Sequence, residues 1–260
     1  MKNSIWPVLV VVVIAAIGGI AWYLHSQELA PAPAPAIAAQ PAAPPPAPAT
    51  HYPLEGTQAP PAKPLPSLDG SDAEAHRSIV ELFGQAADLF QLKDIIRRIV
   101  VTVDNLPRER VSNRLMVLKP VPGRFVVSGA QGAASISPDN YSRYAPYVHL
   151  VQAVDIGKLV AVYVRLYPLF QQAYVNLGYP DGYFNDRLVA AIDNLLATPK
   201  VGGPPQLTQP KVMYEYADPE LESLSAGQKM LLRMGPDNAA VVEGKLRELR
   251  TAVTRSSVAH

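Results

Sequence analysis

Hydrophobic and polar positions divide the chain into three parts, each with its own pattern. Residues 5–24 form an apolar run without a charged side chain, residues 30–66 are mostly Pro and Ala, and the rest mixes apolar clusters with polar, Gly and Pro breaks. These patterns are typical of a membrane-spanning helix, an extended spacer and a folded domain, respectively.

The apolar run at residues 5–24 has the length of a transmembrane helix. At about 1.5 Å per residue it spans the roughly 30 Å hydrocarbon core, and Trp6 and Trp22 stand near its ends, where such rings favour the interface. A cleaved signal peptide has a shorter apolar region with a small-x-small site close behind it, whereas residues 36–38 lie well beyond this run. We therefore expect an uncleaved anchor, and Lys2 before it predicts that the amino terminus is cytoplasmic.

The segment from Ala30 to Pro66 predicts a solvated spacer. Repeated Pro fixes φ and removes backbone donors, so neither a helix nor a central strand is expected. A ligand for proline-binding modules is the alternative, because Pro45 and Pro48 have the required spacing, but no basic residue stands beside them. We assign residues 25–66 to a disordered Pro/Ala-rich linker.

The remainder predicts a helix-rich domain. The capping-box pattern at Ser71–Glu74 and the stop at Gly84 indicate a first helix, and spacings of three and four favour a second from Lys93 to Asn105, ended by Pro107. Caps and spacing also predict the later helices, with Asn185 as the cap of one of them and a kink expected at Pro168 in another. These helices are one after Ser137–Pro138–Asp139, then Pro146–Ala153, Asp155–Leu177, one from Asn185 through Leu196, Glu222–Met234 and Asp237–Arg250.

Short strands complete the predicted fold. Leu115–Leu118 and Arg124–Val127 flank a Pro/Gly turn and form a candidate pair, and Lys211–Tyr216 alternates apolar and polar residues. Strands and helices do not alternate in the way that builds a parallel sheet. The expected fold class is α+β and mostly helical, with a few short antiparallel strands, in a globular domain at residues 67–252 followed by a flexible tail at 253–260.

Composition excludes several functions. The chain has 23 Lys+Arg against 22 Asp+Glu, a net charge of +1, which provides no excess of positive charge for a nucleic acid. Because it has no cysteine, disulfides, thiolate nucleophiles, zinc-thiolate sites and iron–sulfur clusters are excluded.

Six segments of the domain carry a distinctive pattern: Val103–Arg108, Lys119–Phe125, Ser137–Tyr141, Tyr163–Gln172, Gly182–Leu188 and Gln209–Val212. Together they resemble a bacterial family of domains of unknown function, numbered 3014. The resemblance implies an amino-terminal anchor, a Pro/Ala-rich spacer and a periplasmic domain on the inner membrane of a Gram-negative bacterium, which agrees with an anchor at residues 5–24 and residues 1–4 in the cytoplasm. It implies no catalytic residues, and the chain lacks the Pro-Glu helix start that the family pattern has near Gln91–Leu92.

Catalytic motifs are missing from the sequence. The domain contains only His76 and His149, without a His-Glu-x-x-His, Gly-x-Ser-x-Gly or phosphate-loop motif, so we predict no catalytic residue, metal site or cofactor. A carboxylate pair for glycan cleavage is the alternative, because such a pair is recognised by its separation in space. Its candidates are Asp104, Asp181, Asp186, Glu215 and Asp218.

An aromatic cluster is the candidate binding face. Tyr141, Tyr144 and Tyr147 are spaced by three, with Arg143 among them, and Tyr and Arg are favoured in binding surfaces. The alternative is that these rings pack at the edge of the core. The sequence thus predicts a membrane-tethered periplasmic binding or scaffolding module with an envelope protein or glycan as partner; the alternative is an envelope hydrolase acting on peptidoglycan or glycan through acidic residues.

Overall fold

The computed structural model describes residues 51–54, 64–130 and 132–255. The predicted cytoplasmic terminus (1–4), the transmembrane helix (5–24), most of the linker and residues 256–260 of the tail lie outside the described residues. Within them the fold is mostly helical with short antiparallel strands, as predicted. The helices are α2 (Asp72–Phe83), α3 (Ile95–Asn105), α4 (Asp139–Arg143), α5 (Ala145–Ala153), α6 (Ile156–Asn176), α7 (Phe184–Leu196), α8 (Pro219–Glu222), α9 (Ala226–Met234) and α10 (Pro236–Thr254).

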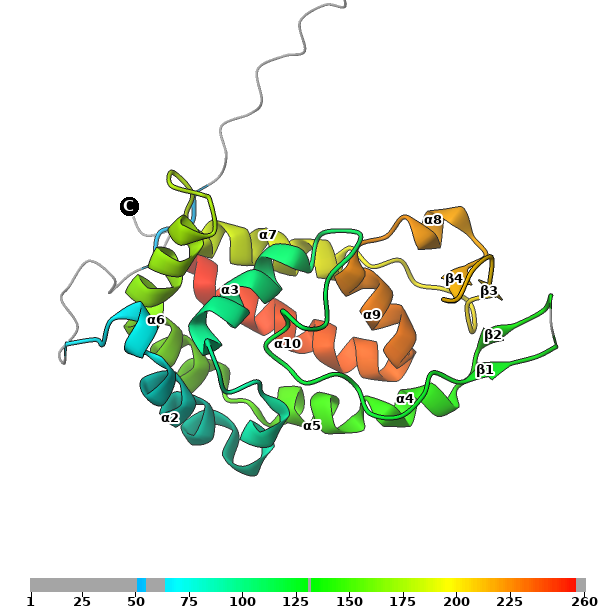
Figure 1. Ribbon diagram of the computed structural model, residues 1–260, viewed down its shortest axis with the longest axis horizontal. Coiled ribbons are helices and arrows are strands. Elements are labelled where there is room, and N and C mark those ends of the chain that lie inside the picture. The colour runs from blue at the N-terminus through cyan, green and yellow to red at the C-terminus, as the bar shows by residue number, and fades with distance from the viewer. Residues whose placement is uncertain (1–50, 55–63, 131, 256–260) are drawn as a thin grey trace, which may run out of the picture. The chain divides into compact units, whose positions relative to one another are not determined.

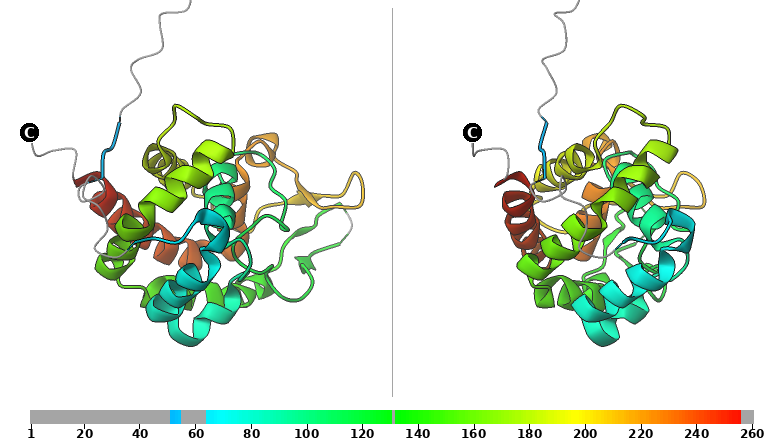
Figure 2. Two further views of the ribbon diagram at one scale, coloured as in Figure 1. Left: turned by 60° about the vertical axis from the view of Figure 1, so that its left-hand side comes forward. Right: turned by 90° about the vertical axis from the view of Figure 1, so that its left-hand side faces the viewer.

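Helix α10 packs against α5, α6, α7 and α9 (Figure 1). Helix α3 lies against α6 and α7, and α2 packs against α3 and α6 (Figure 2). The largest core cluster lies among α2, α3, α6 and α7, where the rings of Phe170 and Phe184 stack at 5.6 Å. Burying each such ring stabilises the fold by about 1.5–3 kcal/mol.

The starts of α2 and α3 are linked. Helix α2 begins where predicted, but the expected capping box is wrong, because the Ser71 hydroxyl donates to the Leu68 carbonyl instead of capping α2. The Asp72 carboxylate accepts hydrogen bonds from the backbone amides of Asp94 and Ile95, at 2.9 Å each. A residue of α2 therefore supplies the cap of α3, which starts two residues later than predicted.

Helices α6 and α7 occur as expected, with a different cap. Helix α6 continues through Pro168. The predicted cap at Asn185 is wrong, since Tyr183 occupies the N-cap position and Asn185 is buried in the first turn of α7. The side-chain oxygen of Gln171 instead accepts a hydrogen bond from the Phe184 amide at 2.8 Å. Here again a partner from a neighbouring helix satisfies the terminal donor.

The carboxyl-terminal helices divide differently from the prediction. The helix predicted at Glu222–Met234 begins only at Ala226, as α9, because Ser225 and Gln228 form a capping box there, and Glu222 is instead the last residue of the short helix α8. Helix α10 extends to Thr254, beyond the predicted end of the domain at residue 252, and Val253 is fully buried.

Four short strands gather at one end of the domain (Figure 1). The predicted pairing of Leu115–Leu118 with Arg124–Val127 is wrong, because Leu118 bridges to Phe90. The predicted strand at residues 211–216 is reduced to its last two residues. The strands are β1 (Val127–Ser128) paired with β2 (Ser135–Ile136), and β3 (Leu207–Thr208) paired with β4 (Glu215–Tyr216), both antiparallel, with a Ser135–Gln206 bridge between the pairs.

The structure differs from the predicted linker at residues 51–54. Leu54 is only 7% exposed and belongs to the main core cluster, and Tyr52 packs beside it. Tyr and Leu are apolar residues within a tract otherwise poor in them, so burying them is favourable. The packed part of the chain thus includes a segment amino-terminal to Ser67.

Among the described residues, no single helix is both long and apolar enough to cross a membrane; α5 and α6 pass that test only as a pair, with an 85° bend between them.

Candidate functional site

The four residues of the predicted binding face lie on α4 and α5 and at the junction between them. Tyr144 is only 9% exposed and packs with Val148 and Leu231. Burial raises the pKa of the Tyr144 phenol, although Arg233 and Arg143 oppose this effect. At this position the geometry favours the packing role.

Arg143 and Tyr147 hold a loop. The Arg143 guanidinium donates to the carbonyls of Pro122 at 2.8 Å and Gly123 at 2.9 Å, and to the Asn140 side chain at 2.8 Å. The Tyr147 hydroxyl donates to the carbonyl of Lys119 at 3.1 Å. The Arg143 bonds are charge-assisted and so among the stronger ones, and together with the neutral Tyr147 bond they fasten residues 119–123 to α4 and α5.

Tyr141 reaches a surface hollow. Its ring lies against Gly235, where a Cβ would come within 2.6 Å of the ring carbon Cγ. The hollow has a volume of about 240 Å³ and lies between α4 and the junction of α9 with α10. Its rim includes the exposed residues Ser142 and Asp237. Of the four predicted residues, Tyr141 is the one that lines this concave surface, and partner contact at all four stays a prediction.

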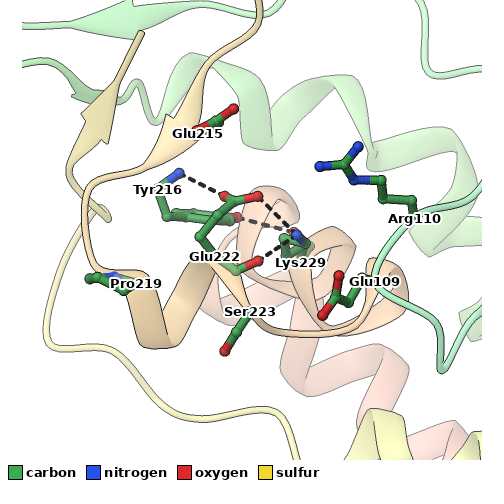
Figure 3. Close-up of a pocket in the computed structure, with 8 residues that line it drawn as sticks. All are labelled: Glu109, Arg110, Glu215, Tyr216, Pro219, Glu222, Ser223 and Lys229. Atoms are coloured by element: carbon green, nitrogen blue, oxygen red, sulfur yellow. Dashed lines mark hydrogen bonds and ion pairs between the residues drawn. The ribbon is translucent and has the colours of Figure 1, made fainter. Parts of the chain in front are cut away.

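A second hollow lies beside α8 and α9 (Figure 3). It has a volume of about 370 Å³ and is open to solvent. It is lined mainly by charged side chains: Glu109, Arg110, Glu215, Tyr216, Pro219, Glu222, Ser223 and Lys229.

An ion pair between the buried Lys229 and the partly exposed Glu222 lines the second hollow. The ammonium group of Lys229 lies 3.0 Å from a carboxylate oxygen of Glu222 and 2.7 Å from the Glu222 carbonyl. The other Glu222 oxygen accepts from the Tyr216 amide at 2.8 Å. Burial opposes ionisation, but these hydrogen bonds and the positive charge of Lys229 outweigh it and lower the pKa of Glu222. A carboxyl group that stays ionised in this way is poorly suited to act as a general acid.

We expect the Glu222 ion pair to make stability depend on pH in the acid range. Because the pKa is lower in the folded state, the stabilising contribution is present above the unfolded value of about 4.3 and is lost as the pH falls through the folded value. Glu222→Gln should therefore lower the thermal midpoint near neutral pH, and the difference from the parent should shrink as the pH falls below the unfolded value of about 4.3.

Circular dichroism melting curves across this pH range would measure the effect. Glu220→Gln, which changes an exposed carboxylate on the same helix, is the matched control and should leave the midpoint nearly unchanged. A difference for Glu222→Gln that stays constant with pH would contradict the assignment.

The carboxylates expected for glycan cleavage are spread over the domain. Asp104 pairs with arginines, Asp186 contacts residues 51 and 52, and Asp218 accepts a hydrogen bond from the Glu220 amide as the cap of α8. Glu215 lines the second hollow, and Asp181 is exposed on the turn before α7. Three of the five candidates therefore have structural partners.

Asp104 is the centre of a polar cluster. Its carboxylate, 3% exposed as a residue, lies 2.6 Å from the Arg108 guanidinium and 3.0 Å from that of Arg187. Arg108 also donates to the Tyr179 hydroxyl at 2.8 Å. The cluster joins α3 and α7, and with them two of the segments noted for their family resemblance, residues 103–108 and 182–188. A single buried carboxylate between two guanidinium groups is arranged for stability.

Sequence reasoning missed Lys229, Glu222 and His51. Lys229 and Glu222 face each other because the chain turns between α8 and α9, and the Ser225–Gln228 capping pattern was the available signal for that turn. The two histidines that the sequence places within the domain, His76 and His149, are both exposed. Within the described part of the chain, no group of three or more His, Cys, Asp or Glu side chains is placed to hold a metal ion.

Comparison with known proteins gives one match. Residues 95–250 match the profile of a family described as "Protein of unknown function (DUF3014)". No curated protein and no solved structure matches the chain significantly.

Proposed function

The chain belongs to the DUF3014 family, and on that premise we propose that it is a membrane-tethered periplasmic binding or scaffolding module of the bacterial cell envelope. The anchor is the uncharged run at residues 5–24, and the Pro/Ala-rich stretch after it holds the domain away from the inner membrane. The orientation follows from Lys2, which precedes the run. The partner is an envelope protein or glycan.

The observation that carries the proposal is the hollow beside Tyr141. An aromatic side chain, a polar rim and a concave surface are the features of a site that binds a protrusion of a partner. Arg143 and Tyr147 fasten residues 119–123 to α4 and α5, and α4 borders the hollow; a rigid site loses less conformational entropy when a partner binds. Their role in this proposal is to position the loop.

The hydrolase alternative gains less support. It requires two carboxyl groups of different protonation on either side of a substrate groove. Asp104 and Asp186 are engaged in hydrogen bonds within the domain, and Glu222 is held ionised by Lys229. The second hollow contains a single tyrosine, Tyr216, whose phenol is buried and donates to the Lys229 carbonyl at 3.3 Å.

Photo-crosslinking in the native envelope tests the proposed binding face. A photoreactive amino acid in place of Ser142 or Asp237, on opposite sides of the hollow, should yield the same discrete crosslinked product. The reason is that a partner seated in the hollow contacts both sides of its rim. Mass spectrometry of the product identifies the partner, and glycan-specific staining detects a glycan.

The matched control carries the same photoreactive group at Glu81, an exposed residue of α2. Helix α2 lies away from α4 in Figure 1, so this position should give no such product. Equal products from all three positions, or none from the two rim positions, would count against the hollow as the binding face.

A further inference from the structure

Residues 51–54, here called the strap, dock on the first turn of α7. The Asp186 carboxylate accepts a hydrogen bond from the Tyr52 amide at 2.7 Å, and its other oxygen lies 2.9 Å from a ring nitrogen of His51. The His51 ring packs on that of Tyr183, with centroids 4.0 Å apart. Two neighbouring residues of the strap are thus held by side chains at one corner of the domain.

Asn185 completes this corner and is built for an extended peptide. Its side-chain amide is 1% exposed and donates to the Tyr52 carbonyl at 2.8 Å and to the Val253 carbonyl at 3.2 Å. Asn185 and Asp186 together therefore bind both the N–H and the C=O of Tyr52, as a neighbouring β-strand would. A buried amide that loses one of its acceptors is costly, so the corner is complete only when the strap is docked.

The strap is only four residues long, so its contacts compete with the cost of ordering it. Its gains include the burial of Leu54, two hydrogen bonds to the Tyr52 backbone and the packing of the His51 ring on Tyr183. They also include the hydrogen bond between Asp186 and His51, whose side chain is 44% exposed. Its costs are the ordering of four residues and the closure of the chain between residues 54 and 64. When these gains and costs are of similar size, the docked and the released strap differ little in free energy, and a modest change in either shifts the equilibrium between them.

We propose that the strap is a releasable fastening that sets the length of the tether. With the strap docked, the chain between the anchor and the domain is residues 25–50, and it reaches at most about 80 Å at roughly 3.1 Å per residue. With the strap released it is residues 25–63, which reach about 120 Å. The distance that the tether reaches from the membrane rests on the proposed function, because it assumes the anchor at residues 5–24. The docking of the strap does not depend on that anchor.

Electron spin resonance on the full chain in nanodiscs tests the proposal. The chain has no cysteine, so Pro53→Cys and Glu81→Cys give two specific labelling sites, one at an exposed position of the strap and one on α2. We expect a dominant narrow distance distribution in the otherwise unchanged chain. Asp186→Ala should broaden it and reduce the narrow fraction at least about threefold, since it removes the acceptor of the Tyr52 amide and of His51.

Two further variants make the result decisive. Asp181→Ala, the same substitution at an exposed carboxylate close to α7, should leave the distribution narrow. Leu54→Ala removes the buried side chain of the strap without touching α7 and should broaden the distribution even where Asp186→Ala impairs folding. A broad distribution in the unchanged chain, or a narrow one in Leu54→Ala, would overturn the proposal. Neither outcome depends on a partner at Ser142 and Asp237, so the proposed function stands or falls separately.

Discussion

Asp104→Ala is expected to lower the free energy of unfolding by about 3 kcal/mol, because it leaves two guanidinium groups without their shared acceptor. The carboxylate is almost fully buried between Arg108 and Arg187, and the Arg187 guanidinium also donates to the Asp104 carbonyl. Breaking a buried pair from one side typically costs about 3–5 kcal/mol. We expect the lower end, since the Arg108 side chain is 49% exposed and water takes over part of its solvation.

Urea denaturation of the parent and the variant would measure this loss. Asp104→Asn keeps the shape and removes the charge, so it should also destabilise the domain, but less than Asp104→Ala. Asp181→Ala is the matched control for a carboxylate at the surface and should change the free energy by less than about 0.5 kcal/mol. Equal effects of Asp104→Ala and Asp181→Ala would contradict the structural role of the cluster.

Gly235→Ala is expected to have an effect of similar size, about 3 kcal/mol, for a different reason. Gly235 has φ 86° and ψ 161°, a conformation that is nearly restricted to glycine and costs another residue about 1–3 kcal/mol. A Cβ would also lie 2.6–2.8 Å from carbons of the Tyr141 ring, and such overpacking costs about 1–3 kcal/mol more. The ring would be pushed away from the surface of the hollow.

The control for Gly235→Ala is Gly244→Ala. Gly244 lies inside α10, and a Cβ there would meet no described atom within 4 Å beyond its own helix. This substitution should stabilise the chain by about 0.5–1 kcal/mol, since alanine is the better helix former. Thermal midpoints of both variants would test the pair, and the same sign of change in both would refute the argument.

Helical spacing predicted most helices because it reflects which face of a segment is buried. The second helix, for example, was correctly placed from the recurrence of Ile95, Ile96 and Ile99 despite its β-branched residues. The residues that cap the helices were harder to predict, since Asp72 caps α3, which starts 23 residues later, and Gln171 of α6 caps α7. Such partners are set by tertiary packing, which local patterns do not contain.

The candidate binding face shows the same limit. Tyr141, Tyr144 and Tyr147 are spaced by three, but the helix break predicted at Pro146 falls between them, since α4 ends at Arg143 and α5 begins at Ala145. The turn between them directs Tyr144 into the core and Tyr141 towards Gly235. The residue types were predictable, whereas their directions depended on a helix break between two adjacent apolar stretches.

The strap could not be located from composition. A tract rich in Pro and Ala predicts a spacer throughout, yet two apolar side chains, Tyr52 and Leu54, suffice to dock four of its residues. The hydrogen bonds that hold the Tyr52 backbone come from Asn185 and Asp186, more than 130 positions away.

The cap that Asp72 provides to α3 has a consequence for cooperativity. The segment that matches the family begins at residue 95, where α3 starts, and ends at residue 250, before the buried Val253. Melting of α2 would expose two amides at the start of α3, so the two helices should open as one unit in native-state hydrogen exchange. We therefore expect the cooperative unit to be larger than the segment by which the family is recognised, so that the boundary of the family match and the boundary of cooperative unfolding differ.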